Sequence, residues 1–400
     1  MRQHLKTFLI AILILTMIVG CGNTSKEDAS KETTKEHLLI RSYYETEAQA
    51  DGLDELCATF NESQEKYEIA WEYVPMTEFD KKISRAYTEQ ELPDIVIIDN
   101  PDMKKFIQLD MFEDITSYAS TLNLETDYYS SSVNTIKYNN LYYGVPFNSN
   151  NVCLIYRKDL LEESNITPPK NWDELKTAAQ KLTTDDTYGF LMSAMNSEQG
   201  AFQILSWVMA ASNSDSQITT DALSCAYDYL ANLINEGYMP ADCLNYSQTD
   251  IARRFINGDI AMMENGPWVF SMLDEAGIDY GLAPMPKNKR NAVILGGENL
   301  GIIKGKNVEG AIEFIKFCME KGGNESFCKK ANLLPSRVES AQNIIVENPK
   351  LEIIDAQMDY AIVRTDIEGY SGISKQLTSN FRSVVTGDLS AEEAAMKTLN

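Results

Sequence analysis

The feature that most constrains the fold is an alternation of strand-like and helix-like segments near the start of the chain. Three segments have strand patterns and two have apolar residues at helical spacing: 38–40, 67–74 and 94–99 for strands, 51–64 and 77–90 for helices. The third strand (DIVIID) is apolar at consecutive positions, which indicates burial on both faces, as in a parallel sheet. This βαβαβ order favours a doubly wound α/β lobe whose ligand edge lies at the carboxyl ends of the strands.

A second region with its own strands and helices begins near residue 141. Residues 151–156 (NVCLIY) predict a strand, and Asn171 with Glu174 predicts a capping box that opens the next helix. We expect further helices at 201–211, 221–236, 249–257 and 309–321, and short strands at 260–263 and 300–304. Gly258 is expected to end the third of these helices as a C-cap.

The N-terminus has the pattern of a secretion signal. Arg2 and Lys6 precede an apolar run at 8–19, which is short for a membrane span. Gly20-Cys21 at its end resembles the lipobox of bacterial lipoproteins, which implies that 1–20 is a cleaved signal peptide and that Cys21 carries the lipid. The polar segment that follows cannot bury enough surface to fold, so 21–37 is predicted to be a disordered tether.

Composition excludes several classes of function. The net charge of −24 makes a nucleic-acid partner improbable, because phosphate binding needs a basic face. The two histidines, His4 and His37, lie before the predicted folded body, which argues against histidine-dependent catalysis and histidine-ligated metals there. Nucleotide-binding and hydrolase motifs are absent from the sequence as well, so we expect no cofactor and no metal.

The cysteines give no metal or redox motif. Seven are scattered along the chain without a CxxC pair: Cys21, Cys57, Cys153, Cys225, Cys243, Cys318 and Cys328. Several of them stand in apolar stretches, which favours buried thiols, but disulfides stay open for a protein outside the cell.

Five segments, taken in order, resemble the extracellular solute-binding proteins of ABC importers, in the maltose-binding-like group. They are PDIV at 93–96, YGVP with LIYRKDL at 143–146 and 154–160, PPKNWDEL at 168–175, FINGDIAMMENGPW at 255–268, and YGLAPMP with GG at 280–286 and 296–297. The resemblance implies an α/β, two-lobed, periplasmic-binding-protein-like fold in which each lobe is a sheet flanked by helices. It also implies that a ligand closes the lobes about a hinge.

The same resemblance gives expected lobe boundaries. Residues 38–146 with 281–328 would form the N-terminal lobe, and 150–277 with 330–400 the C-terminal lobe. The hinge is expected near 145–148 and 278–282, with a third crossing near 333–336.

A sugar offers C–H faces that stack on aromatic rings and hydroxyls that pair with carboxylates and amides. Cleft candidates are therefore aromatic and acidic or amide residues near strand ends and glycine turns. We expect the ligand to contact Tyr44, Glu45, Asp99, Asn100, Asn150, Trp207, Trp268, Glu298 and Tyr370.

For some of these candidates the sequence favours contact with the ligand, and for others it fits core packing or helix capping equally well. Trp268 follows the NGP turn and matches the family tryptophan that stacks on sugar. Trp207, in an apolar helix, fits core and cleft equally, and Asp99 fits a helix N-cap as well as a ligand contact. Asn150 stands where many relatives carry an acid. The set contains no Lys or Arg, which favours a neutral sugar over an anion.

The sequence thus predicts an extracellular, lipid-anchored substrate-binding subunit that captures a carbohydrate and delivers it to the ABC permease. It would be a monomer held at the membrane through Cys21, and not an enzyme. A secreted glycoside hydrolase using two carboxylates stays open, as does a sugar sensor or adhesin that does not serve transport. Ligands other than sugars also stay open, although the sequence argues against metals.

Overall fold

The computed structural model describes residues 35–320 and 322–400, and the predicted signal peptide, Cys21 and most of the tether lie outside these residues. The residues from 35 onward form one compact unit. Within the part of the chain that is described, no helix combines the length and apolarity needed to cross a bilayer.

The first sheet confirms the predicted βαβαβ order. Its five strands run in the order β2-β1-β3-β12-β6, with bounds Tyr67–Tyr73, Glu36–Ser42, Ile95–Asp99, Glu298–Ile302 and Gly144–Pro146. Strand β1 pairs in parallel with β2 and β3, whereas β12 is antiparallel to β3 and β6. The carboxyl ends of β1 and β3 therefore lie at one edge, where the sequence analysis expects the ligand.

Strand β3 is buried on both faces, as its apolar run predicts. All five of its residues are buried. Ile95 and Ile97 pack into one hydrophobic core, whereas Val96 and Ile98 pack into another with Phe79 and neighbouring side chains. The helices that accompany this sheet are α1 (Glu47–Ser63), α2 (Met76–Glu89), α3 (Asn100–Gln108), α4 (Thr116–Ala119), α5 (Leu124–Asp127), α6 (Ser130–Ile136), α13 (Val308–Glu320) and α14 (Gly323–Ala331).

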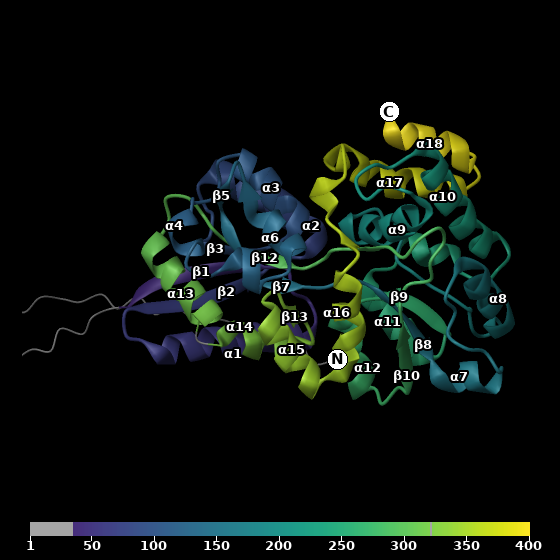
Figure 1. The fold of residues 1–400 in the computed structure, drawn as a ribbon, viewed down its shortest axis with the longest axis horizontal. Coiled ribbons are helices and arrows are strands. Elements are labelled where there is room, and N and C mark those ends of the chain that lie inside the picture. The colour runs from purple at the N-terminus through teal and green to yellow at the C-terminus, as the bar shows by residue number, and fades with distance from the viewer. Residues whose placement is uncertain (1–34, 321) are drawn as a thin grey trace, which may run out of the picture. The chain divides into compact units, whose positions relative to one another are not determined.

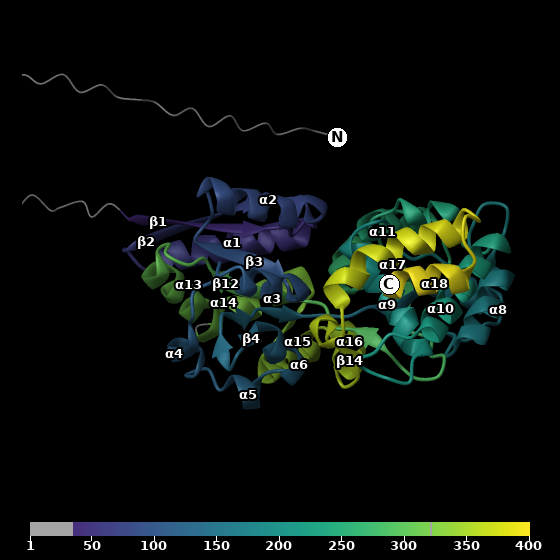
Figure 2. The ribbon, with the colours of Figure 1, turned by 90° about the horizontal axis from the view of Figure 1, so that it is seen from above.

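A second, three-stranded sheet has the order β10-β8-β9 and is antiparallel throughout. Its strands are Tyr280–Ala283, Cys153–Arg157 and Met262–Asn265. The helices that follow this sheet are α7 (Lys158–Glu163), α8 (Trp172–Leu182), α9 (Glu198–Ala211), α10 (Thr220–Asn235), α11 (Gln248–Asn257), α12 (Phe270–Glu275), α17 (Tyr370–Val385) and α18 (Ala391–Leu399). Figures 1 and 2 show α8, α9, α10, α17 and α18 gathered on one side, away from α1, α2, α13 and the first sheet.

Short paired segments connect the two groups. Strand β7 (Asn148–Ser149) pairs with β13 (Leu334–Pro335), and β11 (Val293–Ile294) pairs with β14 (Ala361–Ile362). The remaining elements are β4 (Lys137–Tyr138), β5 (Leu141–Tyr142), α15 (Val338–Glu347), α16 (Glu352–Met358) and four 3-10 turns, η1 (Ala241–Leu244), η2 (Pro267–Val269), η3 (Pro349–Leu351) and η4 (Arg364–Asp366).

The expected lobe boundaries stay a proposal, and β10 shifts one of them. Residues 280–283 pair with β8 of the second sheet, although the sequence analysis placed 281–283 in the N-terminal lobe. The chain joins the first sheet only at Glu298, where β12 begins. Sequence similarity marks this stretch as a crossing strand but does not say with which strand it pairs.

The structure also tests two predicted helix caps, one at the start of α8 and one at the end of α11. Asn171 caps α8 by accepting from the backbone N–H of Glu174, as predicted. The Glu174 carboxylate, however, accepts from the backbone of Lys170 at 2.8 Å and not from that of Asn171, so the expected reciprocal box is not formed. Gly258 ends α11 in the left-handed region, with φ of 89°, which confirms the expected C-cap.

Candidate functional site

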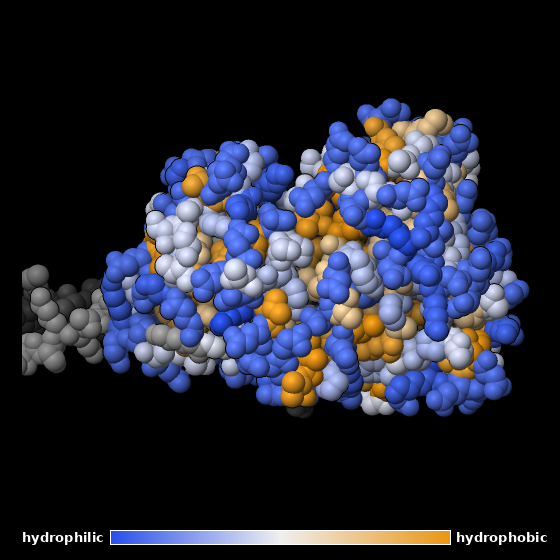
Figure 3. Space-filling view, viewed as in Figure 1, coloured by the Kyte–Doolittle hydropathy of each residue, from blue (hydrophilic) through white to orange (hydrophobic). Residues whose placement is uncertain are grey.

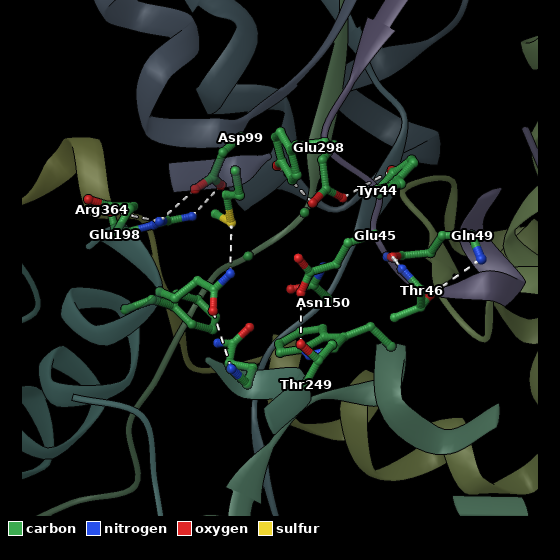
Figure 4. A pocket seen from close by; sticks show the side chains of 18 residues that line it. Tyr44, Glu45, Thr46, Gln49, Asp99, Asn150, Glu198, Thr249, Glu298 and Arg364 are labelled. Carbon is green, nitrogen blue, oxygen red and sulfur yellow. Dashed lines mark hydrogen bonds and ion pairs between the residues drawn. The ribbon is translucent and has the colours of Figure 1, made fainter. Parts of the chain in front are cut away.

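A cavity of about 80 Å³ lies between the carboxyl edge of the first sheet and the helices and turns of the second group (Figure 4). Six of the nine predicted ligand residues line it: Tyr44, Glu45, Asp99, Asn150, Trp268 and Glu298. Tyr44 and Glu45 follow β1, Asp99 ends β3 and Glu298 begins β12, so the sheet topology brings these four together. Their role as ligand contacts remains a prediction.

Glu298 is a buried carboxylate in the cavity wall. Unlike Asp99, it has no ion-pair partner among the described residues. Its side chain accepts from the hydroxyl of Tyr43 at 2.9 Å and from that of Tyr44 at 3.2 Å. Asn148 in turn donates to the Tyr44 oxygen at 2.5 Å. Burial, followed by the charge of Asp99, raises the pKa of Glu298 to about 7. The cavity therefore contains a carboxyl group that exchanges its proton near neutral pH.

A buried ion cluster forms another wall of the cavity. Arg364, which opens η4, donates to both carboxylate oxygens of Asp99, at 2.9 and 2.5 Å, and to Glu198 at 2.8 Å. Burial alone would lower the pKa of Arg364, but the charges of Asp99, Tyr370 and Glu198 raise it well above its usual value. Asp99 occupies the N-cap position of α3 without a side-chain cap bond, because its carboxylate is committed to Arg364.

Trp268 lies at the cavity on the η2 turn, where the NGP sequence was expected to hold it. Its ring centre is 6.4 Å from that of Phe202, at a tilt of 52°. A Cβ on Gly266 would come within 2.1 Å of the Trp268 ring, so the glycine is needed for this ring position. The buried indole N–H of Trp268 has no partner among the described residues. The turn thus places an aromatic side chain in the cavity wall.

Asn150 is held by the backbone that crosses the cavity. It forms an antiparallel bridge with Gly296, with N–H···O distances of 3.1 and 2.8 Å. A Cβ on Gly296 would meet the Asn150 side-chain oxygen at 2.1 Å. The two glycines of the expected GG segment both line the cavity, and they leave room for the amide of Asn150.

Three predicted residues do not line this cavity. Trp207 is 1% exposed, stacks on Tyr229 and contacts Trp172 at a tilt, and donates to Glu264 at 2.6 Å, so the structure places it in the core. Asn100 is buried beside Thr135, and its backbone N–H donates to Gly297.

Tyr370, the third of them, lies behind the cavity wall, where its hydroxyl donates to Glu198. It lines a larger neighbouring groove of about 690 Å³ that shares Tyr43, Asp99 and Glu198 with the first cavity.

Ten residues of the cavity wall, from both groups of elements, were not predicted from the sequence. The missed residues include a cation, a phenylalanine and several amides and hydroxyls: Tyr43, Thr46, Gln49, Met76, Glu198, Gln199, Phe202, Gln248, Thr249 and Arg364. The expectation of a cleft without Lys or Arg is wrong, because Arg364 lies in it. Tyr43 could have been found from its place after β1, whereas no local pattern marks Arg364.

Single polar contacts also bridge the cavity elsewhere. The Thr249 hydroxyl at the start of α11 donates to the Glu45 carboxylate at 3.1 Å (Figure 4). Gln199, near the start of α9, donates to the sulfur of Met76 at 3.6 Å, and it accepts from the backbone of Gln248.

The described residues contain six cysteines, all with free thiols. They are Cys57, Cys153, Cys225, Cys243, Cys318 and Cys328, and five of the six are buried. Across residues 35–320 and 322–400, no group of three or more His, Cys, Asp or Glu is arranged to hold a metal ion. Most of the outer face seen in Figure 3 is hydrophilic, and apolar side chains gather near the middle, between the two groups of elements.

Comparisons with solved structures agree with this architecture. A solute-binding protein of an ABC transporter from Thermotoga lettingae, bound to alpha-D-tagatose, has a TM-score of 0.83 and 22% identity, and the match covers 91% of this chain and 98% of that one. Maltose-bound MalE3 of T. maritima gives the same TM-score and coverage at 21% identity. At these identities the likeness establishes the fold, which is two-lobed and α/β.

Relatives by sequence are more distant or partial. A maltotriose-binding protein of Pyrococcus abyssi is 27% identical over 228 residues, which are 55% of this chain and 47% of that protein. A galactooligosaccharide-binding protein of Bacillus subtilis is 19% identical over 412 residues, covering 98% of this chain and 95% of that protein. A Brucella abortus protein is 26% identical over 274 residues, 64% of this chain, and the match spans just under two thirds, 66%, of that relative's length.

A family model decides the classification. The model described as bacterial extracellular solute-binding protein matches residues 55–353, which is most of the chain and includes every strand of the two sheets except β1. Together with the two-lobed fold and the cavity between its sheets, this match makes the chain a member of the bacterial extracellular solute-binding protein family.

Proposed function

We propose that the chain captures a sugar or oligosaccharide in the cavity between Trp268 and Glu298 and delivers it to the permease of an ABC importer. The observation that carries the proposal is the composition of the cavity wall. It combines aromatic rings with carboxylates and amides, which are the groups that C–H faces and hydroxyls of a sugar require. Solute-binding proteins of similar fold bind tagatose and maltose, and similar sequences bind maltotriose and galactooligosaccharide.

The cavity volume supports capture by closure. At about 80 Å³ it is smaller than the few hundred Å³ typical of ligand sites. A sugar therefore enters when the two lobes move apart, and it contacts both of them when they return. Such a ligand stabilises the closed state because it binds that state better than the open one.

The location and partners follow from the same proposal. The family is extracellular. Lipid on Cys21 would hold the protein at the outer face of the membrane, and a polar tether from Cys21 to the start of β1 at Glu36, two residues shorter than predicted, would let it reach the permease. We expect a monomer, because an opening and closing cleft fits poorly into a large subunit contact.

A panel of sugars in a thermal-shift assay tests the proposal. The panel contains tagatose, maltose, maltotriose, lactose and galactooligosaccharides, each added to the mature protein. We expect at least one of them to raise the melting temperature, because a ligand that binds the folded state alone stabilises it. No shift with any sugar would contradict the proposal. New reducing ends after incubation with oligosaccharides would instead identify a glycoside hydrolase.

A further inference from the structure

One charged contact crosses the cavity from one group of elements to the other. Asp99 is the last residue of β3 in the first sheet. We place Arg364 in the second group because the strand just before it, β14, pairs with β11, which packs against α9, and because its own turn, η4, packs against α17. The same turn also contacts α3 of the first group. Glu198 is the first residue of α9 itself. The cluster therefore links the first sheet to the second group at the cavity, next to the pair formed by β11 and β14.

The geometry of this contact is that of a strong, specific pair. Arg364 is 3% exposed and Asp99 5%, and the guanidinium engages both oxygens of the Asp99 carboxylate. Bidentate charged hydrogen bonds of this kind are about twice as strong as neutral ones. The Arg364 guanidinium also lies over the ring of Phe202, 5.0 Å from its centre. Arg364 occupies two of the about four acceptor positions of the Asp99 carboxylate, and Asp99 is almost fully buried.

The other side-chain contacts across this cavity are weaker. Thr249 gives one hydrogen bond to Glu45, a residue that is exposed. Gln199 reaches Met76 through a long contact to sulfur. Among the contacts described across the cavity, the pair between Arg364 and Asp99 is therefore the one able to hold the lobes together.

We propose that Arg364 is a positioning residue that latches the two lobes closed, and that Asp99 serves this latch in place of the solute. The proposal rests on capture between two lobes but is independent of which solute is captured. A latch of this kind sets how much of the protein is closed before any solute binds, and so it sets the apparent affinity for every solute.

Removal of the Arg364 guanidinium should shift the protein from the closed form toward the open form. In an Arg364→Met variant the closed form would bury the carboxylates of Asp99 and Glu198 near each other without a cation. Breaking one partner of a buried pair is strongly unfavourable, whereas in the open form water solvates both carboxylates. The ratio of closed to open molecules should fall by at least about tenfold. Lysine keeps the charge but cannot form the fork, so Arg364→Lys should fall between wild type and Arg364→Met.

Small-angle X-ray scattering of the sugar-free protein tests the latch. We expect the radius of gyration to increase in the order wild type, Arg364→Lys, Arg364→Met. Arg254→Met is the matched control, since it removes a guanidinium that pairs with Asp259 in the turn after its own helix, and its radius should equal that of wild type.

A wild-type radius in a folded Arg364→Met variant would overturn the latch, whatever the sugar panel shows. If circular dichroism finds Arg364→Met unfolded, Arg364→Lys decides: a larger radius than wild type supports the latch and an equal one overturns it. A panel without a binding sugar, together with the expected order of radii, would contradict the proposed solute and leave the latch standing.

Discussion

Glu298 shows how a single buried carboxyl group links stability to pH. Two neutral phenols donate to it, and its side chain is largely removed from water. Burial disfavours the charged form, so the folded protein keeps a proton that the unfolded chain would release at lower pH. The same property makes Glu298 a partner that can accept from, or donate to, a sugar hydroxyl near neutral pH.

The substitution Glu298→Gln should flatten part of the pH dependence of stability. The pKa of Glu298 rises from 4.5 to about 7 on folding, so between these values the folded state binds more protons than the unfolded one. Raising the pH through this window therefore destabilises wild type, by roughly 3 kcal/mol from this group. Urea unfolding at about pH 5 and about pH 8 should show a larger loss of free energy in wild type than in the variant.

Asp102, whose pKa burial also raises, to about 8, is present in both proteins and cancels in this comparison. Equal losses in wild type and Glu298→Gln would show that Glu298 does not hold its proton as proposed.

Trp207 and Trp268 are both cleft candidates from the sequence, but the structure places them in different surroundings. Trp207 donates to the fully buried Glu264, whose other oxygen has no partner among the described residues. Trp268 faces the cavity with an unpaired N–H. The first is a core residue, and the second lines the cavity.

Trp207→Phe should reduce stability without changing sugar binding. The variant removes the donor to Glu264 and leaves a buried acidic group unpaired, which costs about 1–3 kcal/mol. Urea unfolding measures this loss, and titration with the sugar found in the panel measures binding. A loss of affinity with little loss of stability would place Trp207 in the binding site after all.

At the scale of elements, the segment that enters β12 is the most constrained part of the cavity wall. Gly297 has φ of 117°, a conformation that side chains rarely adopt, and a Cβ there would lie 2.2 Å from the carbonyl oxygen of Asn148. The backbone thus packs directly against the β7 crossing. This close approach places Glu298 next to Tyr44.

Gly297→Ala should therefore lower the free energy of unfolding by more than the cost of placing alanine at a positive φ, because the added Cβ also clashes with the backbone of Asn148. Gly305→Ala is the matched control, because Gly305 also has positive φ, 75°, but has no atom within 4 Å of the added carbon. The control should lose about 1–2 kcal/mol, and Gly297→Ala at least about 2 kcal/mol more. Equal losses in urea unfolding would show that the crossing segments are not tightly packed.

The sequence predicts helices and strands better than it predicts which strands pair and which side chains meet. The βαβαβ unit, the double burial of β3 and the Gly258 cap all arise from local periodicity and backbone preference, which a single chain displays. The pairing of β10 with β8 and the position of Arg364 arise from contacts between residues far apart in sequence. No local pattern carries that information.

The same distinction explains the candidate site. Residues that follow β1 and β3, such as Tyr44 and Asp99, could be placed because parallel strands deliver their carboxyl ends to one edge. Residues from α9 and α11, such as Gln199 and Thr249, could not, because nothing in their own segments marks the helix end that meets the first sheet. Hence the acidic and aromatic residues at the strand ends and at the NGP turn were predicted, and most of the helix residues in the cavity wall were not.

At the scale of the whole molecule, the two sheets share a small cavity bridged by an ion pair and by a few polar contacts. A solute that pairs with Glu298 and Asn150 on one side and stacks on Trp268 on the other would favour the same closed arrangement. Recognition by a permease then depends on the balance between open and closed forms. Binding of the solute and closure of the lobes are therefore coupled, because the solute binds the closed form better than the open form.

Calorimetric titration of Trp268→Ala with the sugar that gives the largest thermal shift tests this view most directly. Trp71→Ala is the control, because Trp71 lies on β2 and donates to Asp54 at 2.7 Å, away from the cavity. We predict that Trp268→Ala weakens binding by about 2 kcal/mol or more, roughly thirtyfold, and that Trp71→Ala binds as wild type does. Wild-type affinity in Trp268→Ala would contradict a sugar site at this cavity.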